Sequence, residues 1–240
     1  MTDLTFALIA AAGNILGGLA AIRGAKLGIR IISGFIAFGA GFMIAVSVTQ
    51  MLPEALEIGG RGAVWFVLAG YLLVHLTQHT ATQHFHFGEE THQVPHVAGI
   101  TALIGLLLHT FFDGVAIASG FAVSPALGVL VFFAIVLHKL PEGLTIASLQ
   151  LAGGTKPSRA LGSAALLGAA TVVGVLTTDA FTFLTAHGLA ISAGVTLYVA
   201  ASNLVPEFQG KHGYGLPAAF FVGAATAVGL GAGLAALGVH

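Results

Sequence analysis

Two short segments of the sequence carry the same arrangement of side chains that can bind a metal ion. His109 precedes Asp113 by four residues and His138 precedes Glu142 by four residues, and each carboxylate is followed by a glycine. Residues four apart on an α-helix lie on the same face, one turn apart. Each segment therefore offers one imidazole and one carboxylate in the same direction. Both segments lie in long apolar runs, where ionisable side chains are costly and mark functional sites.

The two segments are expected to meet at one depth. Ser124-Pro125 is a short connection, so the helices on either side of it are predicted to be antiparallel neighbours. His109 lies about 15 residues before this turn and His138 about 13 after it, at about 1.5 Å per residue. Two histidines and two carboxylates suit Zn²⁺, and also Fe²⁺, Mn²⁺, Co²⁺ or Cd²⁺. The alternative is a hydrogen-bonded polar cluster that only fixes helix packing.

The composition indicates an integral membrane protein. Of the 240 residues, 57% are hydrophobic and only 7% are charged, whereas a soluble domain has about 25% charged residues. The 34 glycines allow close packing of membrane helices. There is no cysteine, which excludes thiolate ligands, and the net charge of −1 gives no basic tail for nucleic acid. The first apolar run lacks the basic start of a signal peptide, so it is read as a retained helix.

Eight transmembrane helices in one domain, residues 1–240, are predicted from runs of about 20 apolar residues. They lie at 4–22, 31–55, 62–82, 96–121, 125–150, 159–181, 187–208 and 216–239. The break between 181 and 187 carries the weakest sequence signal.

Lysine and arginine set the predicted orientation. With both termini on the non-cytoplasmic side, the outer loops hold only Arg61, and Lys139 lies within a helix. The inner loops then hold Arg23, Lys26, Arg30, Lys156, Arg159 and Lys211. The sequence therefore predicts a multi-pass protein of the cell membrane, inner or plasma, with a cytoplasmic loop at 82–96.

An internal repeat relates the second and seventh predicted helices. The segments 47–54 and 200–207 both end in Pro-Glu, with an amide four residues before the glutamate, at Gln50 and Asn203. Helices five apart cross in opposite directions, so this is an inverted repeat, typical of secondary transporters. It predicts a 3+2+3 arrangement, with helices 1–3 and 6–8 around a central pair, helices 4 and 5. A chance match between short apolar segments is the alternative.

Further polar residues are candidates for an ion pathway. Met43, Ser47, Gln50 and Glu54 follow one face of the second helix, and Asn203 and Glu207 are their counterparts in the seventh. Pro53, Pro141 and Pro206 each precede a glutamate and remove a backbone donor, although each could be a simple packing kink.

Four residues are expected near membrane interfaces, where Asp179 or His187 could attract cations: Asp179, His187, His212 and His240. A histidine-rich tract without cysteine indicates loose metal capture, or only a solvated loop: His79, His84, His86, His92 and His96.

With these motifs the chain resembles the ZIP (Zrt/Irt-like) zinc and iron permeases, most closely the bacterial zinc-uptake branch. The family patterns His-Asn-x-x-Asp/Glu-Gly, His-x-x-Pro-Glu-Gly and Leu-Pro-Glu-Ala correspond to residues 109–114, 138–143 and 52–55. The resemblance implies a metal importer with a mid-membrane centre on helices 4 and 5. It also implies an elevator-like movement of helices 1, 4, 5 and 6.

Three positions depart from the two-metal version of the family. Thr110 replaces a common asparagine, Lys139 stands where a second-metal ligand often lies, and Thr171 falls where many members have glutamate. Our hypothesis is a single metal, with the Lys139 ammonium in the electrostatic role of the second, attracted to Glu142 or Asp113.

The predicted function is divalent-metal import driven by gradients, because no nucleotide-binding motif appears, and no organic cofactor is expected. Zn²⁺ is the expected substrate. Uptake should weaken in acid below about the ordinary histidine pKa of 6.5, because only neutral histidine binds metal. A metal-selective channel stays open as an alternative. An intramembrane metal-dependent hydrolase is disfavoured, because no His-Glu-x-x-His motif or spare general base is present. Expected partners are membrane lipid and divalent ions, and a homodimer stays open.

Overall fold

The computed structural model describes residues 2–24, 29–81, 96–209, 211 and 213–237. In these ranges the chain is helical and contains no strand. The α-helices are α1 (Thr2–Ile22), α2 (Ile29–Val46), α3 (Leu52–Gly59), α4 (Ala63–Ala81), α5 (His96–Val123), α6 (Pro125–Ala152), α7 (Pro157–Ala180), α8 (Thr182–Tyr198) and α9 (Gly215–Ala236). Two π-helical segments, η1 (Ser47–Met51) and η3 (Val199–Leu204), and one 3₁₀ turn, η2 (Gly60–Gly62), join or end them.

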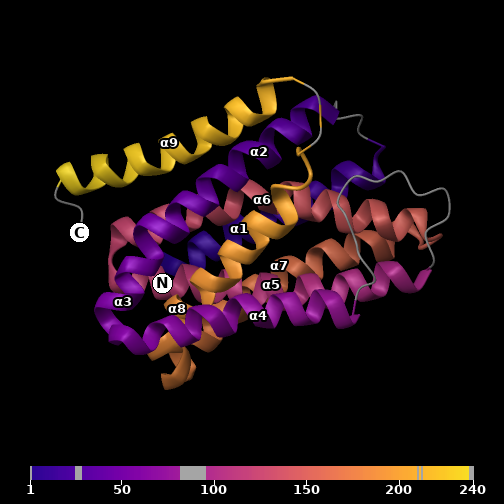
Figure 1. The fold of residues 1–240 in the computed structure, drawn as a ribbon. Coiled ribbons are helices and arrows are strands. Elements are labelled where there is room, and N and C mark those ends of the chain that lie inside the picture. The colour runs from indigo at the N-terminus through magenta and orange to yellow at the C-terminus, as the bar shows by residue number, and fades with distance from the viewer. Residues whose placement is uncertain (1, 25–28, 82–95, 210, 212, 238–240) are drawn as a thin grey trace.

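Seven stretches of the described chain are long and apolar enough to cross a membrane, which identifies an all-α, multi-pass membrane protein. The longest, Ser33–Gln78, has 46 residues and contains the reversal at Gly60, where φ is +57°. After this reversal, α4 runs in the opposite direction to α2 (Figure 1). This stretch is therefore a helical hairpin rather than one straight helix.

The two π-helical segments each precede a proline of the predicted repeat. The amide of Leu52 bonds to the carbonyl of Ser47, and that of Val205 to the carbonyl of Ala200 at 3.0 Å, both with a spacing of five residues. Proline lacks the amide that would continue an α-helical ladder, so the register shifts in the preceding turn. Pro141 behaves differently, because it lies inside the continuous helix α6.

Two boundaries of the seventh predicted helix were wrong. The helix begins at Thr182 rather than at 187, because Phe181 alone is extended between α7 and α8. One extended residue leaves no glycine, proline or charge to mark the break. The helical segment also ends at Leu204 rather than at 208, because Pro206 stops it, so Glu207 lies in a turn beyond η3.

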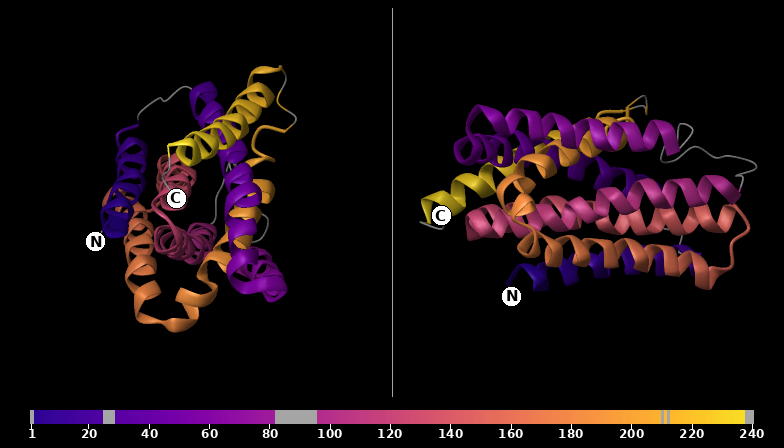
Figure 2. Two further views of the ribbon diagram at one scale, coloured as in Figure 1. Left: turned by 90° about the vertical axis from the view of Figure 1, so that its left-hand side faces the viewer. Right: turned by 90° about the horizontal axis from the view of Figure 1, so that it is seen from below.

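The helices form two sets. In the first, α1 packs on α6 and α7, and α5 packs on α6 and α7; in the second, α2 packs on α9 and α4 on α8. The end-on view in Figure 2 places α1 and α7 on one side and α2 and α4 on the other. The sets meet mainly where α5 contacts α8 and α2 contacts α6.

Reciprocal glycines build four of the closest crossings. At each crossing, a Cβ atom on either glycine would collide with a carbonyl oxygen of the facing helix, so the backbones can approach only because both residues are glycine. The pairs are Gly17 with Gly143 (α1–α6), Gly114 with Gly174 (α5–α7), Gly41 with Gly223 (α2–α9) and Gly70 with Gly194 (α4–α8).

Candidate metal centre

The two histidine segments lie side by side, as predicted. Ser124 caps α6, its hydroxyl accepting a hydrogen bond from the amide of Leu127 at 3.2 Å, so α5 and α6 turn back on each other over one residue. His109 and Asp113 lie on α5 and His138 lies on α6. All three side chains are buried. The short turn thus places residues that are distant in sequence at one depth in the membrane.

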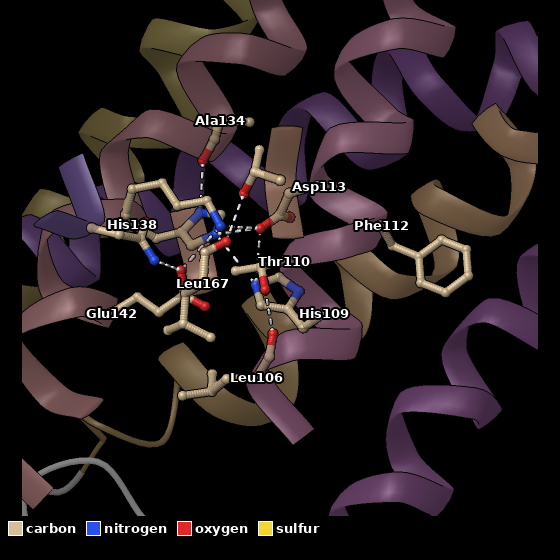
Figure 3. Close-up of polar contacts among 12 residues, drawn as sticks. Leu106, His109, Thr110, Phe112, Asp113, Ala134, His138, Glu142 and Leu167 are labelled. Atoms are coloured by element: carbon tan, nitrogen blue, oxygen red, sulfur yellow. Dashed lines mark hydrogen bonds and ion pairs between the residues drawn. The ribbon is translucent and has the colours of Figure 1, made fainter. Parts of the chain in front are cut away.

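Three ligand atoms of these side chains form a nearly equilateral triangle. The Nε2 atoms of His109 and His138 are 3.3 Å apart, and each lies 3.4 Å from Oδ2 of Asp113. Figure 3 shows the three side chains pointing toward one another. Tetrahedral zinc, with bonds of about 2.0–2.1 Å, has ligand atoms about 3.3–3.4 Å apart. These atoms therefore have the separations of three ligands on one ion, with a fourth position left over.

Hydrogen bonding orients His138 for ligation. Its Nδ1 atom lies 3.1 Å from the carbonyl oxygen of Ala134, one turn earlier on α6 (Figure 3). A proton on Nδ1 would be donated to this carbonyl and would leave Nε2 as a lone-pair ligand, a common second contact of metal-binding histidines. Among the described residues, Nδ1 of His109 and Oδ1 of Asp113 are buried without a hydrogen-bond partner. Such atoms are costly unless water or an ion binds them.

Glu142 is not brought into this triangle. The Lys139 ammonium lies between the two carboxylates, 2.6 Å from Oδ2 of Asp113 and 3.0 Å from Oε2 of Glu142. Asn14 of α1 donates a second hydrogen bond to Oε2 of Glu142 at 3.2 Å. The structure therefore clusters three of the four expected ligands. It holds the fourth, the Glu142 carboxylate, beyond a lysine whose side chain is fully buried. The other oxygen of Glu142 is buried and has no partner among the described residues.

Thr110 and Thr171, the two threonines singled out in the sequence, use their hydroxyl protons within their own helices. The Thr110 hydroxyl donates to the carbonyl of Leu106 at 2.6 Å and approaches that of Leu107 at 3.1 Å. The Thr171 hydroxyl reaches the carbonyl of Leu167 at 3.5 Å. Both side chains are buried. Neither supplies a charge to balance Asp113, and Lys139 does.

The candidate pathway residues follow α2, η1 and α3. Met43 is fully buried, and Ser47 is buried with a hydroxyl that lacks a partner in the described part of the chain. Gln50 is half-buried beside Gly231 of α9, and Glu54 lines a cavity at the end of α3. In the seventh helix, Asn203 lies in η3 and Glu207 beyond it. Over the described ranges, one group of three or more His, Asp or Glu side chains is close enough to share an ion, and it consists of His109, Asp113 and His138.

The histidine-rich tract cannot be placed on this site. His84, His86 and His92 lie outside the described residues, as do His212 and His240, and the side chains of His79, His96 and Asp179 are also not described.

Asn14 is the site residue that the sequence reasoning missed. It is fully buried in α1 and hydrogen-bonded to Glu142, and the neighbouring Gly17 allows α1 to approach α6 closely. The available signal was a lone amide within the first apolar run, close to two glycines.

Comparison with known proteins agrees with these observations. The family model described as "ZIP Zinc transporter" matches residues 74–237. Zinc transporter ZIP9-B of Xenopus laevis is 29% identical over 158 residues, which cover 60% of this chain and 52% of that protein. Zinc transporter ZupT of Escherichia fergusonii is 32% identical over 124 residues, 47% of this chain and 48% of that protein. The chain thus spans about half the length of the curated relatives it matches. These relatives are named as transporters and not as enzymes, as the sequence predicted, and the chain belongs to the ZIP zinc transporter family.

Proposed function

We propose that the chain carries Zn²⁺ across the membrane into the cytoplasm through the cluster of His109, Asp113 and His138. The observation that carries this proposal is the triangle of buried ligand atoms, with edges of 3.3 and 3.4 Å, on two adjacent membrane helices. A cluster with three protein ligands leaves one coordination position for exchange, as in zinc sites that must bind and release. Fe²⁺, Mn²⁺, Co²⁺ and Cd²⁺ are further candidate substrates, because a mixed nitrogen and oxygen site selects weakly among them.

One ion at a time is proposed, with Lys139 in the place of a second. Its ammonium bridges Asp113 and Glu142 at 2.6 and 3.0 Å, as a cation shared by two carboxylates would. Glu142 is proposed as the fourth ligand during transfer, because its second oxygen is buried without a partner in the described chain.

The proposed architecture is one domain, residues 1–240, of eight crossings in a 3+2+3 arrangement. Three features support it: the hairpin within Ser33–Gln78, the π-helical turn before each Pro-Glu pair of the repeat, and the glycine crossings. The spacing from Gly41 to Glu54 is the same as the spacing from Gly194 to Glu207. The spacing from Glu54 to Gly70 is likewise the same as that from Glu207 to Gly223. An inverted repeat that pairs α2 with α8 and α4 with α9 would also relate the α2–α9 crossing to the α4–α8 crossing.

The proposed movement is of elevator type. The set α1, α5, α6 and α7, which holds Asn14, the cluster and Lys139, would slide against the set α2–α4, α8 and α9. Both termini would face away from the cytoplasm. Met43, Ser47 and Gln50 would line the path, with Asn203 and Glu207 as their inner counterparts, and the histidine-rich loop would accept the ion. The exposed apolar faces of α4 and α9, with Trp65 and Phe221, would contact lipid or, in a homodimer, a second copy.

Uptake of Zn²⁺ and Fe²⁺ into proteoliposomes tests the proposal. His138→Ala removes one of three ligands, and uptake is expected to fall at least about 10-fold, because the fourth position cannot replace a fixed imidazole. His75→Ala is the matched control, since His75 is an exposed histidine of α4. Uptake by the His138 variant equal to wild type would contradict the site assignment.

The alternatives give different signals in the same vesicles. A channel would give single-channel currents and no saturation at low metal concentration, whereas a carrier saturates. A membrane hydrolase would show no metal flux at all.

A further inference from the structure

A cavity with a few polar groups lies away from the metal cluster, where the ends of α3 and α5 meet the start of α8. Its volume is about 370 Å³. Most of its lining is apolar or small, and four residues supply its polar side chains: Glu54, Ser119, Thr185 and His187. Glu54 belongs to α3, Ser119 to α5, and Thr185 and His187 to α8.

Ser119 is the polar group that packing alone does not explain. Its side chain is only 5% exposed, and its hydroxyl has no hydrogen-bond partner in the part of the chain that the structure describes. Gly188 faces it so closely that a Cβ atom there would lie 2.7 Å from the hydroxyl. A buried hydroxyl without a protein partner is costly unless water or an ion can reach it.

The imidazole of His187 is held in a fixed orientation at the same cavity. Its ring stacks on Phe66 of α4, with centroids 3.9 Å apart and planes within 11°, and Phe183 contacts it edge-on. Stacking on Phe66 thus fixes the plane of the ring at the wall of the cavity. Together with the Glu54 carboxylate, the cavity offers one negative charge and several neutral hydrogen-bonding groups.

The size of the cavity decides which form of a cation it can take. A water molecule occupies about 30 Å³ of liquid, so this cavity has room for roughly a dozen waters, more than the six around a hydrated divalent ion. The cluster on α5 and α6 is different, because its ligand atoms are 3.3 to 3.4 Å apart and buried. The cavity therefore suits an ion with its water shell, and the cluster suits an ion without it.

The cavity and the cluster share helix α5. Ser119 follows Asp113 by six residues, about 9 Å along the helix axis. Between them, Val115 is fully buried and packs near Gly188, and Ser192 donates a hydrogen bond to the carbonyl of Phe112 at 3.1 Å. The crossing of α5 and α8 thus separates the two sites, and a relative movement of these helices would open the way between them.

We propose that this cavity is a second, weaker site, which holds a hydrated divalent cation before it loses water and enters the cluster. The role of this cavity site rests on the proposed transport function, whereas ion binding at the cavity can be measured without transport. The waters bound to the ion would donate hydrogen bonds to Glu54, to an imidazole nitrogen of His187 and to the Thr185 hydroxyl. Losing the water shell in two stages would lower the largest single free-energy barrier on the way to the buried cluster, with the total cost of dehydration unchanged.

Equilibrium binding of Mn²⁺, followed by the spin-resonance signal of the free hydrated ion, tests the cavity directly. In a His109→Ala/His138→Ala variant the cluster is disabled, and a weak Mn²⁺ site is expected to remain at the cavity, in addition to loose binding by the histidine-rich tract. Adding Glu54→Gln should raise its Kd roughly two- to fivefold, the size expected for losing one partly hydrated charge. Glu57→Gln is the matched control, because Glu57 is an exposed carboxylate of the same helix that does not line the cavity. No remaining site, or an equal effect of both substitutions, would overturn the inference.

Uptake kinetics provide a second measurement with the cluster intact. Glu54→Gln should raise the Zn²⁺ concentration for half-maximal uptake roughly two- to fivefold and leave the maximal rate largely unchanged, whereas His138→Ala should lower the maximal rate. An unchanged half-maximal concentration for Glu54→Gln counts against the cavity alone. Normal uptake by His138→Ala counts against the cluster alone, so the two failures are distinguishable.

Discussion

Lys139 determines the charge balance of the candidate metal centre. It is a lysine with a fully buried side chain, and its ammonium lies within 3.0 Å of two carboxylates. Two carboxylates, one ammonium and one divalent cation leave a net charge of +1, whereas a second divalent cation beside the ammonium would raise it to +3. Charge of that size in a membrane interior is strongly disfavoured. A single bound metal is therefore the expected state.

Replacing Lys139 should change the number of bound ions. Wild type is expected to bind one ion in the cluster, and Lys139→Asp, which replaces the ammonium with a carboxylate, should bind two. Lys139→Ala should instead lower thermal stability, because losing one partner of a buried ion pair costs about 3–5 kcal/mol. Anomalous scattering counts the ions, and thermal unfolding without metal measures the stability. Two ions in the wild-type cluster would refute the role assigned to Lys139.

Acid should inhibit uptake through the histidines. Protonated imidazole cannot bind a metal, so uptake should decline as the solution is made more acidic. Initial rates of Zn²⁺ uptake between pH 5 and 8, with equal pH on both sides of the vesicle, measure the effect. A rate that rises steadily toward acid would contradict histidine ligation.

At this scale the sequence predicted the meeting of His109, Asp113 and His138, because helical spacing and a short turn determine it. It predicted Glu142 as a fourth ligand beside His138, four residues earlier, whereas Glu142 bonds to Lys139, three residues earlier. Both spacings fall on one helix face. The structure resolves this through Asn14, which belongs to α1 and reaches Glu142 only because two distant helices pack closely.

Individual helices were predictable where apolar runs and charged loops mark them, and less so where the backbone deviates within a run. The hairpin at Gly60 and the α5–α6 turn at Ser124 carry glycine or proline signals. The break at Phe181 carries none, and the helix after it was predicted to begin at 187 rather than at Thr182. The proline kinks were predicted for three helices, but a π-helical turn precedes only Pro53 and Pro206. Proline content alone does not fix the local hydrogen-bond register.

The glycine crossing of α1 with α6 should be sensitive to a single methyl group. Gly143→Ala would place a Cβ atom against the carbonyl of Asn14, and backbone atoms cannot move aside as a side chain can. We expect lower thermal stability, by about 1–3 kcal/mol, and lower uptake, because α1 carries the Asn14 contact to Glu142. Gly162→Ala of α7 is the matched control, since nothing lies within 4 Å of its Cβ position. Similar losses in both variants would count against close packing as the cause.

Across the whole molecule, the residues of the candidate metal centre belong to one helix set, while most of the candidate pathway and cavity residues belong to the other. Asn14, Asp113, His138, Lys139 and Glu142 lie on α1, α5 and α6. Met43 and Glu54 lie on α2 and α3, and His187 lies on α8. The buried ion-pair and hydrogen-bond network stays within the first set. That distribution fits a rigid unit that carries the ion past a second unit, because sliding would break no bond of the network.

A disulfide between the two sets should therefore arrest transport. A Cβ atom on Gly39 of α2 would lie 3.7 Å from Cβ of Leu137 on α6, within the 3.5–4.5 Å range that suits a disulfide. The chain has no cysteine of its own, so Gly39→Cys/Leu137→Cys introduces one pair. Oxidation should reduce Zn²⁺ uptake at least about 10-fold, and a reductant should restore it, if sliding of one set is required. The reduced double variant is its own control for any effect of the substitutions near His138.

A second pair within one set controls for oxidation itself. A Cβ atom on Gly120 of α5 would lie 3.3 Å from Cγ2 of Val131 on α6, so Gly120→Cys/Val131→Cys brings two thiols close together within the proposed moving set. Oxidation of this pair should leave uptake within about twofold of its reduced value, because helices within a rigid unit need no relative motion. Full transport by the oxidised Gly39/Leu137 pair would exclude sliding of α6 past α2. A fixed channel or a different division of the helices would then be required.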